Sequence, residues 1–258
     1  KWWADNDESW HDPSAFGTAV FTDREINEED LGRVLPVPFT TYPIAIDAEA
    51  EFAWSEISPI FGNYRWKEPD SMATPMDAAL CWRATWDYDN LYLWVRVTDD
   101  TLLYEGMEST WQDDGIEMYF DGDGDQSESW PGVDENFFLT NFMPDMIMSP
   151  IVQGKGMEMD STDVMRIQQA QKLTPEGLVM EIAYPLDLLG IEAGDGTLFG
   201  LDIHYNDSDT PGLERDTKIT TFDSTDGTWG NSDRMGLARL MGSQIQSDVK
   251  SEPVVVTS

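Results

Sequence analysis

The chain is poor in basic residues. Among its 258 residues are 15 lysines and arginines against 50 aspartates and glutamates, which gives a formal net charge of −35. Proteins that bind nucleic acid present clustered basic side chains, so this deficit argues against a nucleic-acid partner. The same repulsion disfavours anionic membrane surfaces. We interpret most of the acidity as a solvated surface suited to saline or calcium-rich water, with a few clustered acids available for specific cations.

Cysteine and long hydrophobic runs are also scarce. The single cysteine, Cys81, excludes an intrachain disulfide, and its place in L-C-W-R-A-T-W predicts a small strand residue rather than a nucleophile. No apolar run is long enough to span a bilayer, so we expect no membrane insertion. The chain opens at Lys1 instead of methionine, which fits a processed, exported protein and equally fits a shortened chain. We expect a secreted or cell-surface protein from a marine or saline environment.

Motifs that mark common enzymes are missing. The sequence contains no nucleophile elbow, phosphate-binding loop or H-E-x-x-H segment, and His11 and His204 are its only histidines. With so many acids, a search for the two carboxylates of a glycoside hydrolase is uninformative. His204 alternates with Asp202 and Asn206, which predicts a polar patch on one strand face rather than a catalytic base. We therefore predict that the protein is not an enzyme.

The sequence does contain a succession of short alternating segments. Residues 80–86 and 91–98 alternate around the polar turn 87–90, which predicts a β-hairpin. A short helix is expected within 49–57, with Phe52, Ala53 and Trp54 packing inward. Because long helical periodicity is hard to find, we predict an all-β chain folded as an antiparallel β-sandwich of immunoglobulin-like or jelly-roll-like type. Its further strands are expected at 115–120, 136–142, 165–173, 178–184, 198–206, 217–222 and 235–240.

The regular alternation is confined to the middle of the chain, which predicts three parts. Residues 1–40 form an N-terminal arm, 41–242 form the sandwich and 243–258 form a C-terminal tail that ends in an apolar Val254-Val255-Val256 run. An extended tail can add a strand to the exposed sheet edge of a neighbour. The sequence therefore leaves open a structural role, as a subunit of an extracellular assembly or filament that self-associates through exchanged terminal strands.

Two tryptophans stand in loops beside acids. Trp111 opens W-Q-D-D-G-I-E-M-Y-F-D, and Trp229 lies in D-G-T-W-G-N-S-D-R-M-G. Pyranose rings present apolar C–H faces that pack on indole, while their hydroxyls need polar partners at the rim. The pattern therefore indicates a sugar-binding site. The alternative is that both tryptophans cap the sandwich core.

An acidic loop follows the first of these segments. Its carboxylates stand at alternate positions separated by glycine, in the sequence D-G-D-G-D. Calcium prefers such oxygen ligands, and glycine lets a loop wrap around an ion. A solvated turn is the simpler alternative. The pattern makes Asp121, Asp123 and Asp125 candidate ligands for a calcium ion, with Asp207 and Asp209 as a second, weaker candidate pair.

Taken together, these segments resemble the carbohydrate-binding module family 9 domains and the wider set of DOMON-related sandwiches. The matching motifs stand in family order over about residues 41–241: I-A-I-D-A-E-A-E-F-A-W, A-T-W-D-Y-D-N-L-Y-L-W-V-R-V-T-D, W-Q-D-D-G-I-E-M-Y-F-D, E-G-L-V-M-E-I-A-Y-P-L-D-L-L-G, F-G-L-D-I-H-Y-N-D and W-G-N-S-D-R-M-G-L-A-R-L. The resemblance implies a carbohydrate-binding-module-9-like sandwich with structural calcium. It also implies noncatalytic binding of a polysaccharide or oligosaccharide of plant or marine origin.

The resemblance further implies particular site residues. Sugar-binding members sandwich a terminal sugar between two tryptophans, which the match places at Trp111 and Trp229. Glu117 falls where a family carboxylate accepts hydroxyl hydrogen bonds, and Asp226 stands where the family has an amide. An arginine that the family carries near residues 137–141 is replaced here by Leu139.

Haem binding is a minor alternative. Some relatives of this sandwich hold haem b with a methionine and a histidine or lysine, and this chain has thirteen methionines together with His204 and Lys218. A methionine-rich core is the ordinary explanation. A visible absorption spectrum without a Soret band would remove the haem hypothesis.

Overall fold

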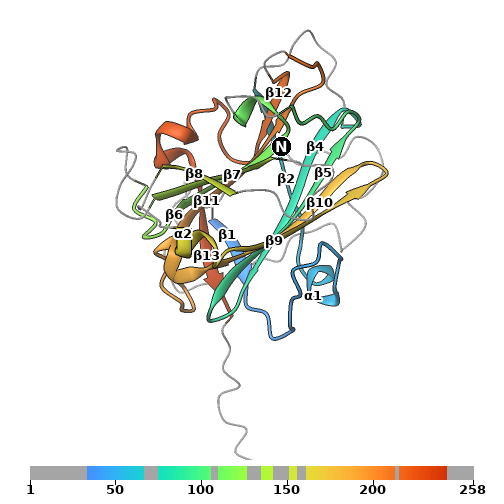
Figure 1. Cartoon of the computed structure of the whole chain (residues 1–258). Helices are drawn as coiled ribbons and strands as arrows, with labels where there is room; N and C mark the ends of the chain where they lie inside the picture. Colours follow the sequence, from blue (N-terminus) through green and yellow to red (C-terminus); the bar gives the residue numbers. More distant parts are fainter. Residues whose placement is uncertain are drawn as a thin grey trace, which may run out of the picture. The chain divides into compact units, whose positions relative to one another are not determined.

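The computed structural model describes residues 34–66, 75–105, 110–126, 135–141, 151–155, 161–212 and 215–242, all within the unit Arg33–Ser258. Two β-sheets pack face to face and form the two layers visible in Figure 1. The described helices are short: α1 (Phe52–Ser55), α2 (Ser161–Val164) and four 3-10 turns. The predicted all-β sandwich is thus confirmed.

The smaller sheet contains the predicted hairpin. The Asp87 carboxylate accepts the backbone N–H groups of Asp89 and Asn90, each at 2.8 Å, and so closes the turn between the two strands of the hairpin. The sheet order is β2 (Ile60–Phe61), β4 (Ala78–Trp86), β5 (Asn90–Asp99), β10 (Gly177–Pro185) and β9 (Gln168–Thr174).

The larger sheet holds the remaining strands, in the order β1 (Val34–Pro38), β13 (Gly236–Met241), β11 (Leu198–Asp207), β6 (Gly115–Asp121), β7 (Glu135–Asn141) and β8 (Ile151–Lys155). One edge of β11 is shared: its first half pairs with β13 and its second half with β12 (Thr217–Thr220). A short outer strand, β3 (Tyr64–Trp66), pairs with β12. The ladders are antiparallel with the exception of β1–β13, whose strands run parallel.

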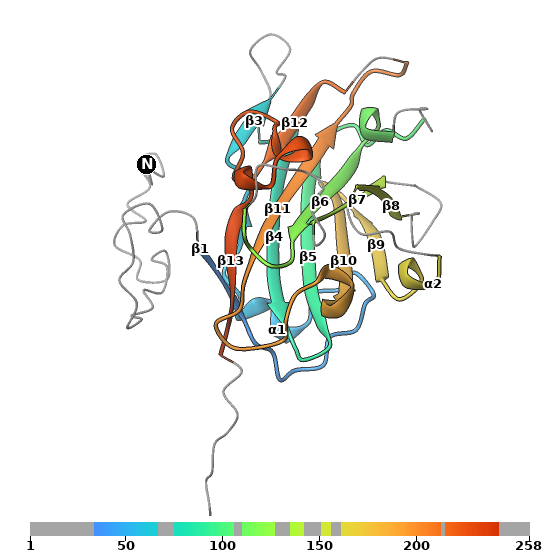
Figure 2. The ribbon, with the colours of Figure 1, turned by 90° about the vertical axis from the view of Figure 1, so that its left-hand side faces the viewer.

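Strand β1 lies inside the segment that the sequence analysis assigned to the N-terminal arm. Figure 2 shows it beside β13 at the margin of the larger sheet. The rest of the arm, residues 1–33, and the tail 243–258 lie outside the described residues. Self-association through these termini therefore stays a prediction.

The core lies between the sheets and on the outer side of the smaller one. Trp82 and Trp86 of β4 are fully buried in the main core. Helix α1 packs on the opposite face of that sheet, where the Trp54 indole N–H donates to Glu181 Oε1 at 2.6 Å. The expected inward packing holds for Ala53 and Trp54 but is wrong for Phe52, which is 61% exposed, because so short a helix buries only one face.

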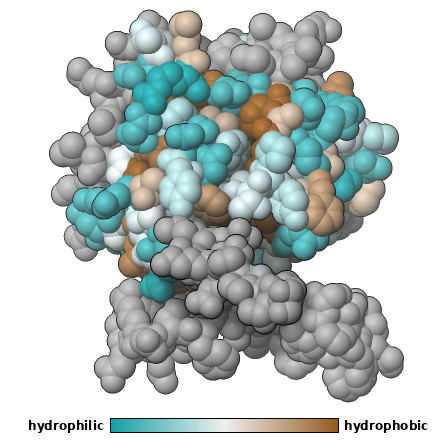
Figure 3. Space-filling model, turned by 90° about the horizontal axis from the view of Figure 1, so that it is seen from below, coloured by the Kyte–Doolittle hydropathy of each residue, from teal (hydrophilic) through white to brown (hydrophobic). Residues whose placement is uncertain are grey.

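The end of the molecule seen in Figure 3 is largely hydrophilic. Among its coloured residues, hydrophobic atoms form small patches that hydrophilic side chains separate. Scattered apolar atoms of this kind are normal for a protein surface. None of the helices in the described ranges is long and apolar enough to cross a membrane.

Candidate functional site

The outer face of the larger sheet carries charged side chains that are buried. On β6, Ile116, Met118 and Phe120 point into the core, so the alternating residues Glu117 and Tyr119 point to the other face. The same alternation places Asp202, His204 and Asn206 of β11, and Lys218 of β12, on that outer face. All of these side chains are at most 3% exposed. Burial of so many polar groups requires partners and points to a built site.

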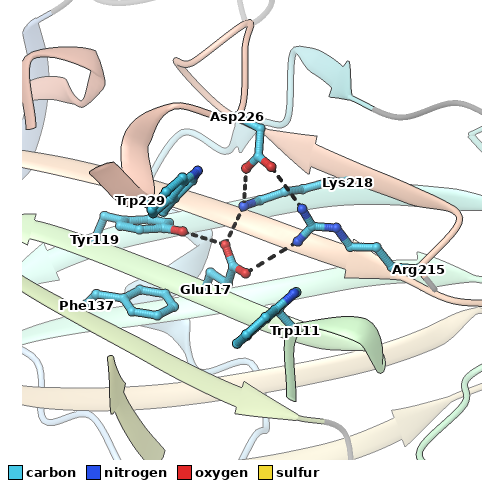
Figure 4. A pocket seen from close by; sticks show the side chains of 8 residues that line it. All are labelled: Trp111, Glu117, Tyr119, Phe137, Arg215, Lys218, Asp226 and Trp229. Atoms are coloured by element: carbon cyan, nitrogen blue, oxygen red, sulfur yellow. Dashed lines mark hydrogen bonds and ion pairs between the residues drawn. The ribbon is translucent and has the colours of Figure 1, made fainter. Parts of the chain in front are cut away.

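A cavity of about 420 Å³ opens over this face. Figure 4 shows its lining: Trp111, Glu117, Tyr119, Phe137, Arg215, Lys218, Asp226 and Trp229. The four residues that the resemblance assigned to sugar binding are all among them, although two segments far apart in the chain supply them. The structure therefore brings the expected sugar-site residues together around one cavity.

The two tryptophans stand on short 3-10 turns and remain open to solvent. Trp111 lies in η4 (Thr110–Gln112) and is 47% exposed; Trp229 lies in η6 (Thr228–Gly230) and is 57% exposed. In Figure 4 they lie on either side of the Glu117 carboxylate. Neither indole is buried as a core cap would be. Their exposed surfaces are available to an apolar face of a ligand.

Glu117 is the centre of the polar floor. Its Oε2 accepts the Tyr119 hydroxyl at 2.6 Å and lies 2.6 Å from Lys218 Nζ, while its Oε1 accepts the Asn206 amide at 2.8 Å. Arg215 Nη1 is 3.7 Å from Oε1. Burial alone would raise the pKa of Glu117, but Lys218, His204 and Arg215 hold it well below its usual value. Glu117 is therefore an ionised hydrogen-bond acceptor.

Asp226 closes the same network from the loop above it. It lies in ion-pair contact with Lys218 and 2.9 Å from Arg215 Nη2. Its backbone has φ +56°, in the left-handed region that side chains other than glycine rarely adopt. This conformation aims the carboxylate back at the two cations. Lys218 and Arg215 are thus each shared between two acids, as the dashed lines in Figure 4 show.

An aromatic wall completes the cavity. Tyr119 and Phe137 stack with ring centroids 4.8 Å apart and planes 19° apart. Arg215 lies over the Trp66 ring, with Cζ 5.1 Å from its centroid. Such stacking restrains the guanidinium, whose planar donors then have a fixed direction.

The sequence analysis missed the cations of this site. Arg215 was not considered, and Lys218 was considered only as a haem ligand. Leu139 lies opposite Glu117 on β7 and is 2% exposed, so the position where the family arginine was expected is apolar. The cations come instead from β12 and the loop before it. The sequence held one signal for these cations. Arg215 and Lys218 stand within four positions of each other in a chain that has only 15 basic residues.

The predicted calcium loop is also brought together. One carboxylate oxygen from each of Asp121, Asp123 and Asp125 lies within 4.8 Å of the others. Several of these oxygens are already used, since Asp121 accepts the backbone N–H groups of Gly124 at 3.0 Å and Gln126 at 2.9 Å. Burial raises the pKa of Asp121 to about 7. The loop is thus stabilised in part by its own backbone.

A second acidic cluster is more deeply buried. Asp99, Asp114 and Asp207 converge from β5, the loop before β6 and the end of β11, with oxygens within 4.8 Å and side chains at most 6% exposed. Neither oxygen of Asp207 accepts a hydrogen bond from a described backbone amide or basic side chain. Burial and neighbouring acids raise the pKa of Asp114 to about 9 and that of Asp207 to about 8. No basic side chain in the described part of the chain pairs with these three acids, so their oxygens form the kind of donor set that a cation would need. Asp209, from the second predicted pair, groups instead with Asp77 and Asp100.

Two curated proteins are similar to this chain over 197 residues. Endo-1,4-beta-xylanase A of Thermoanaerobacterium saccharolyticum is 24% identical, over 76% of this chain and 15% of its own length. Exoglucanase XynX of Acetivibrio thermocellus is also 24% identical, over 76% of this chain and 16% of its own length. The chain thus spans only a small part of these longer relatives.

Known structures share the fold at low sequence identity. A carbohydrate binding module family 9 from Caldicellulosiruptor kristjanssonii matches with a TM-score of 0.69 in its cellotriose complex, at 21% identity over 84% of this chain and 98% of that one. Its glucose complex gives 0.68, at 21% identity over 84% and 100%. A putative carbohydrate-binding protein from Bacteroides uniformis gives 0.54, at 10% identity over 81% and 99%. These likenesses establish the sandwich architecture.

The family itself follows from a match at the level of the sequence. Residues 46–243 match the family described as carbohydrate family 9 binding domain-like. This range includes both exposed tryptophans, the charged floor of the cavity and both acidic clusters, and it covers more than half of the chain. The chain therefore belongs to the carbohydrate family 9 binding domain-like family.

Proposed function

We propose that this domain binds carbohydrate without catalysis, holding the end of a polysaccharide or oligosaccharide between Trp111 and Trp229. The observation that carries the proposal is the cavity itself, in which two half-exposed indoles flank buried, ionised polar groups. The family match supports it. So do two structural relatives, which are complexes with cellotriose and with glucose.

The division of labour follows from the chemistry of sugars. Indole surfaces at Trp111 and Trp229 pack against the C–H faces of a pyranose, which gives affinity without fixing orientation. Glu117 and Asp226 accept hydroxyl hydrogen bonds, and Lys218 and Arg215 donate them. Because these two acids and two bases balance one another, the floor is suited to a neutral sugar.

The wider setting is part of the same proposal. Both curated relatives are named as enzymes, an endo-1,4-beta-xylanase and an exoglucanase, and this chain matches a small part of each. We infer an extracellular role in which the domain holds a polysaccharide near other activities. No reaction is assigned to the cavity, since its carboxylates are both neutralised by Lys218 and Arg215.

Affinity electrophoresis through gels that contain soluble cellulose or xylan derivatives tests the proposal. Trp111→Ala and Trp229→Ala should each weaken retention at least tenfold, because removal of a central aromatic contact typically costs about 2 kcal/mol or more. Phe52→Ala is the matched control: Phe52 is 61% exposed and lies on α1, away from the cavity. It should leave retention unchanged.

The control also defines failure. If the wild-type protein is not retained by any glycan, the proposed function is wrong. If Phe52→Ala weakens retention as much as Trp111→Ala does, retention reflects general surface stickiness and not the cavity.

We further propose that calcium stabilises the domain. The family resemblance implies the ion, and the residues present fit it, because the buried Asp207 carboxylate lacks a donor and hard oxygen ligands surround it. Asp99, Asp114 and Asp207 would hold one ion, and Asp121, Asp123 and Asp125 remain candidates for another. Calcium at the first cluster would neutralise acids that otherwise repel one another in a low-dielectric interior.

A further inference from the structure

His204 is a buried residue next to the cavity that the proposed contacts do not use. It lies on β11 with no exposed surface, and its ring centroid is 4.7 Å from that of Tyr119. Tyr119 lines the cavity and hydrogen-bonds Glu117. His204 is therefore one residue removed from the site, behind the groups that would touch a sugar.

Both nitrogens of His204 face carboxylates. Nε2 lies 3.0 Å from Asp202 Oδ2, and Nδ1 lies 3.7 Å from Glu117 Oε2. Neither nitrogen has a backbone or hydroxyl partner among the described residues. A neutral imidazole has one N–H and one lone pair, so one carboxylate would face a lone pair and be repelled. An imidazolium presents an N–H to each carboxylate.

The charge balance of the buried network points the same way. The described groups that face or adjoin His204 are Asp202 on its own strand, Glu117 and Tyr119 on β6, Lys218 on β12, and Arg215 and Asp226 beyond them. These comprise three carboxylates and two permanent cations. A neutral His204 would leave one uncompensated negative charge in the interior, which is costly, whereas an imidazolium makes the set neutral.

The pKa of His204 is shifted in the direction that this geometry requires. Burial alone would lower it, and Lys218 acts in the same sense. The carboxylates of Asp202 and Glu117 outweigh both and raise the pKa above its ordinary value of 6.5. The site therefore favours the imidazolium over the neutral ring more than water does.

We propose that His204 is a positioning residue of the sugar site: as an imidazolium held between Asp202 and Glu117, it fixes the Glu117 carboxylate toward the cavity and makes sugar affinity depend on pH. This inference rests on the proposed function of the cavity. It assigns the domain a regulatory property: tighter sugar binding below the pKa of His204 and weaker binding above it.

The direction of the effect follows from the contacts. When His204 loses its proton, Glu117 keeps its other partners, including Lys218 and Tyr119, but now faces an imidazole lone pair. We expect binding to weaken about tenfold through this transition, which is equivalent to a change of about one unit in the pKa of His204 when sugar binds.

NMR measures the protonation state of His204 and its pKa, both without and with sugar. The chain has two histidines, and His11→Asn leaves His204 as the only imidazole, so its long-range ¹H–¹⁵N signals are assigned by elimination. Titration should show the doubly protonated form at pH 6 and a pKa above 6.5. Saturation with cellotriose should raise that pKa by about one unit. A pKa that does not move with cellotriose overturns the inference.

His204→Gln provides the second arm, because glutamine keeps a polar side chain but carries no charge. Retention of the wild type on cellulose-derivative gels should fall across the pH range in which NMR shows His204 losing its proton. The variant should bind about tenfold more weakly at pH 6 and lose this pH dependence. Four acids also have pKa values raised toward this range, Asp121 and Glu181 to about 7, Asp207 to about 8 and Asp209 to about 6. They lie outside the cavity and are unchanged in the variant.

The outcomes separate this inference from the proposed function. Binding that stays constant while His204 titrates leaves the sugar site intact and overturns the role of His204. Absence of cellotriose binding at every pH counts against the proposed function instead. In that case a neutral His204 at pH 6 would still overturn the charged bridge, because the NMR signal requires no ligand.

Discussion

Lys218 is the residue on which the charged floor of the cavity depends. It is 1% exposed and lies between Glu117 and Asp226, so its removal leaves two buried carboxylates with one cation to share. Loss of one partner from a buried ion pair typically costs about 3–5 kcal/mol. We expect Lys218→Met to lower the free energy of unfolding, measured with urea, by about that amount, and to weaken sugar retention.

Lys172→Met is the matched comparison for this substitution. Lys172 also pairs with a carboxylate, Glu49, but both side chains are at least half exposed. Exposed ion pairs contribute about 0–1 kcal/mol, so this variant should remain close to the wild type in the same urea titration. If both variants lost the same free energy of unfolding, burial would not be what makes the Lys218 ion pairs stabilising.

Single residues of the site were predictable to different degrees. Trp111, Trp229, Glu117 and Asp226 stand in segments that resemble a known family, so their order in the chain located them. Lys218 and Arg215 were harder to predict. Leu139, the neighbour of Glu117 on β7, carries no charge, and the positive charges that pair with Glu117 come from other segments of the chain. Alternation within one strand does not reveal which cation reaches which acid, because that depends on how β11 and β12 pair.

At the scale of the element, the loop after β12 positions one side of the cavity. Asp223 accepts the backbone N–H groups of Thr225 at 2.8 Å and Thr228 at 2.8 Å, and also that of Gly227. Burial alone would raise the pKa of Asp223, but these hydrogen bonds lower it below its ordinary 3.8. The carboxylate thus holds the turn that carries Trp229.

Asp223→Ala should therefore disorder this loop. We expect sugar retention to fall at least tenfold, because Trp229 loses its fixed position. The free energy of unfolding should also fall, by about 1–3 kcal/mol. Asp195→Ala is the control, since Asp195 also accepts a loop N–H, that of Gly242 at 2.8 Å, but away from the cavity. Retention that falls equally in both variants would contradict a specific role for the Asp223 loop.

Regular elements were predicted where local patterning determines them. The β4–β5 hairpin combines alternating apolar residues with an aspartate that closes its own turn, so its position follows from nearby sequence. The short strands β2, β3 and β8 were not among the expected strands, and β1 lies in the segment that was assigned to the arm. They form strands because they pair with a neighbouring strand at the margin of a sheet. Strand β1, for example, pairs in parallel with β13, about 200 positions away in the chain. Such long-range pairing leaves little trace in the segment itself.

At the scale of the whole molecule, the acidity has two components. Among the described residues, more of the acids are exposed or half-exposed than buried, as expected for a solvated surface. A smaller part is concentrated in buried clusters such as Asp99, Asp114 and Asp207, which screening by salt does not reach. The sequence analysis named the acidic loop and, with Asp209, Asp207 as candidate cation ligands. It missed Asp99 and Asp114, because the members of the buried cluster lie on three separate strands or loops.

These buried acids predict how stability varies with pH when calcium is removed. In the folded state Asp114 and Asp207 have pKa values raised to about 9 and about 8, whereas in the unfolded chain both should ionise near 3.8. Between those values the folded state binds more protons than the unfolded state. The free energy of unfolding of the chelated protein should therefore fall as pH rises from about 5 to 8, by up to about 1.4 kcal/mol per pH unit for each proton.

Calcium should remove this dependence, because it stabilises the ionised carboxylates directly. Melting temperatures at pH 5 and pH 8, with calcium and with a chelator, measure the effect: the calcium-dependent gain should be larger at pH 8. His204 contributes a slope of the same sign, since its raised pKa stabilises the folded state below 6.5 and this contribution is lost as pH rises. Calcium does not change the contribution of His204. The difference between the melting temperatures with calcium and with chelator therefore reports the buried acids alone.

Two substitutions then decide which cluster holds the ion. Asp207→Asn removes the carboxylate that lacks a donor, so it should raise the melting temperature in chelator at pH 8 and abolish the response to calcium. Asp123→Asn changes the exposed acidic loop and should preserve most of that response, because Asp123 is outside the buried cluster. If the response disappears in Asp123→Asn and persists in Asp207→Asn, the stabilising ion belongs to the loop. An equal melting temperature with calcium and chelator in the wild type would leave neither cluster a calcium site, and the buried acids would then be held as protonated carboxyls.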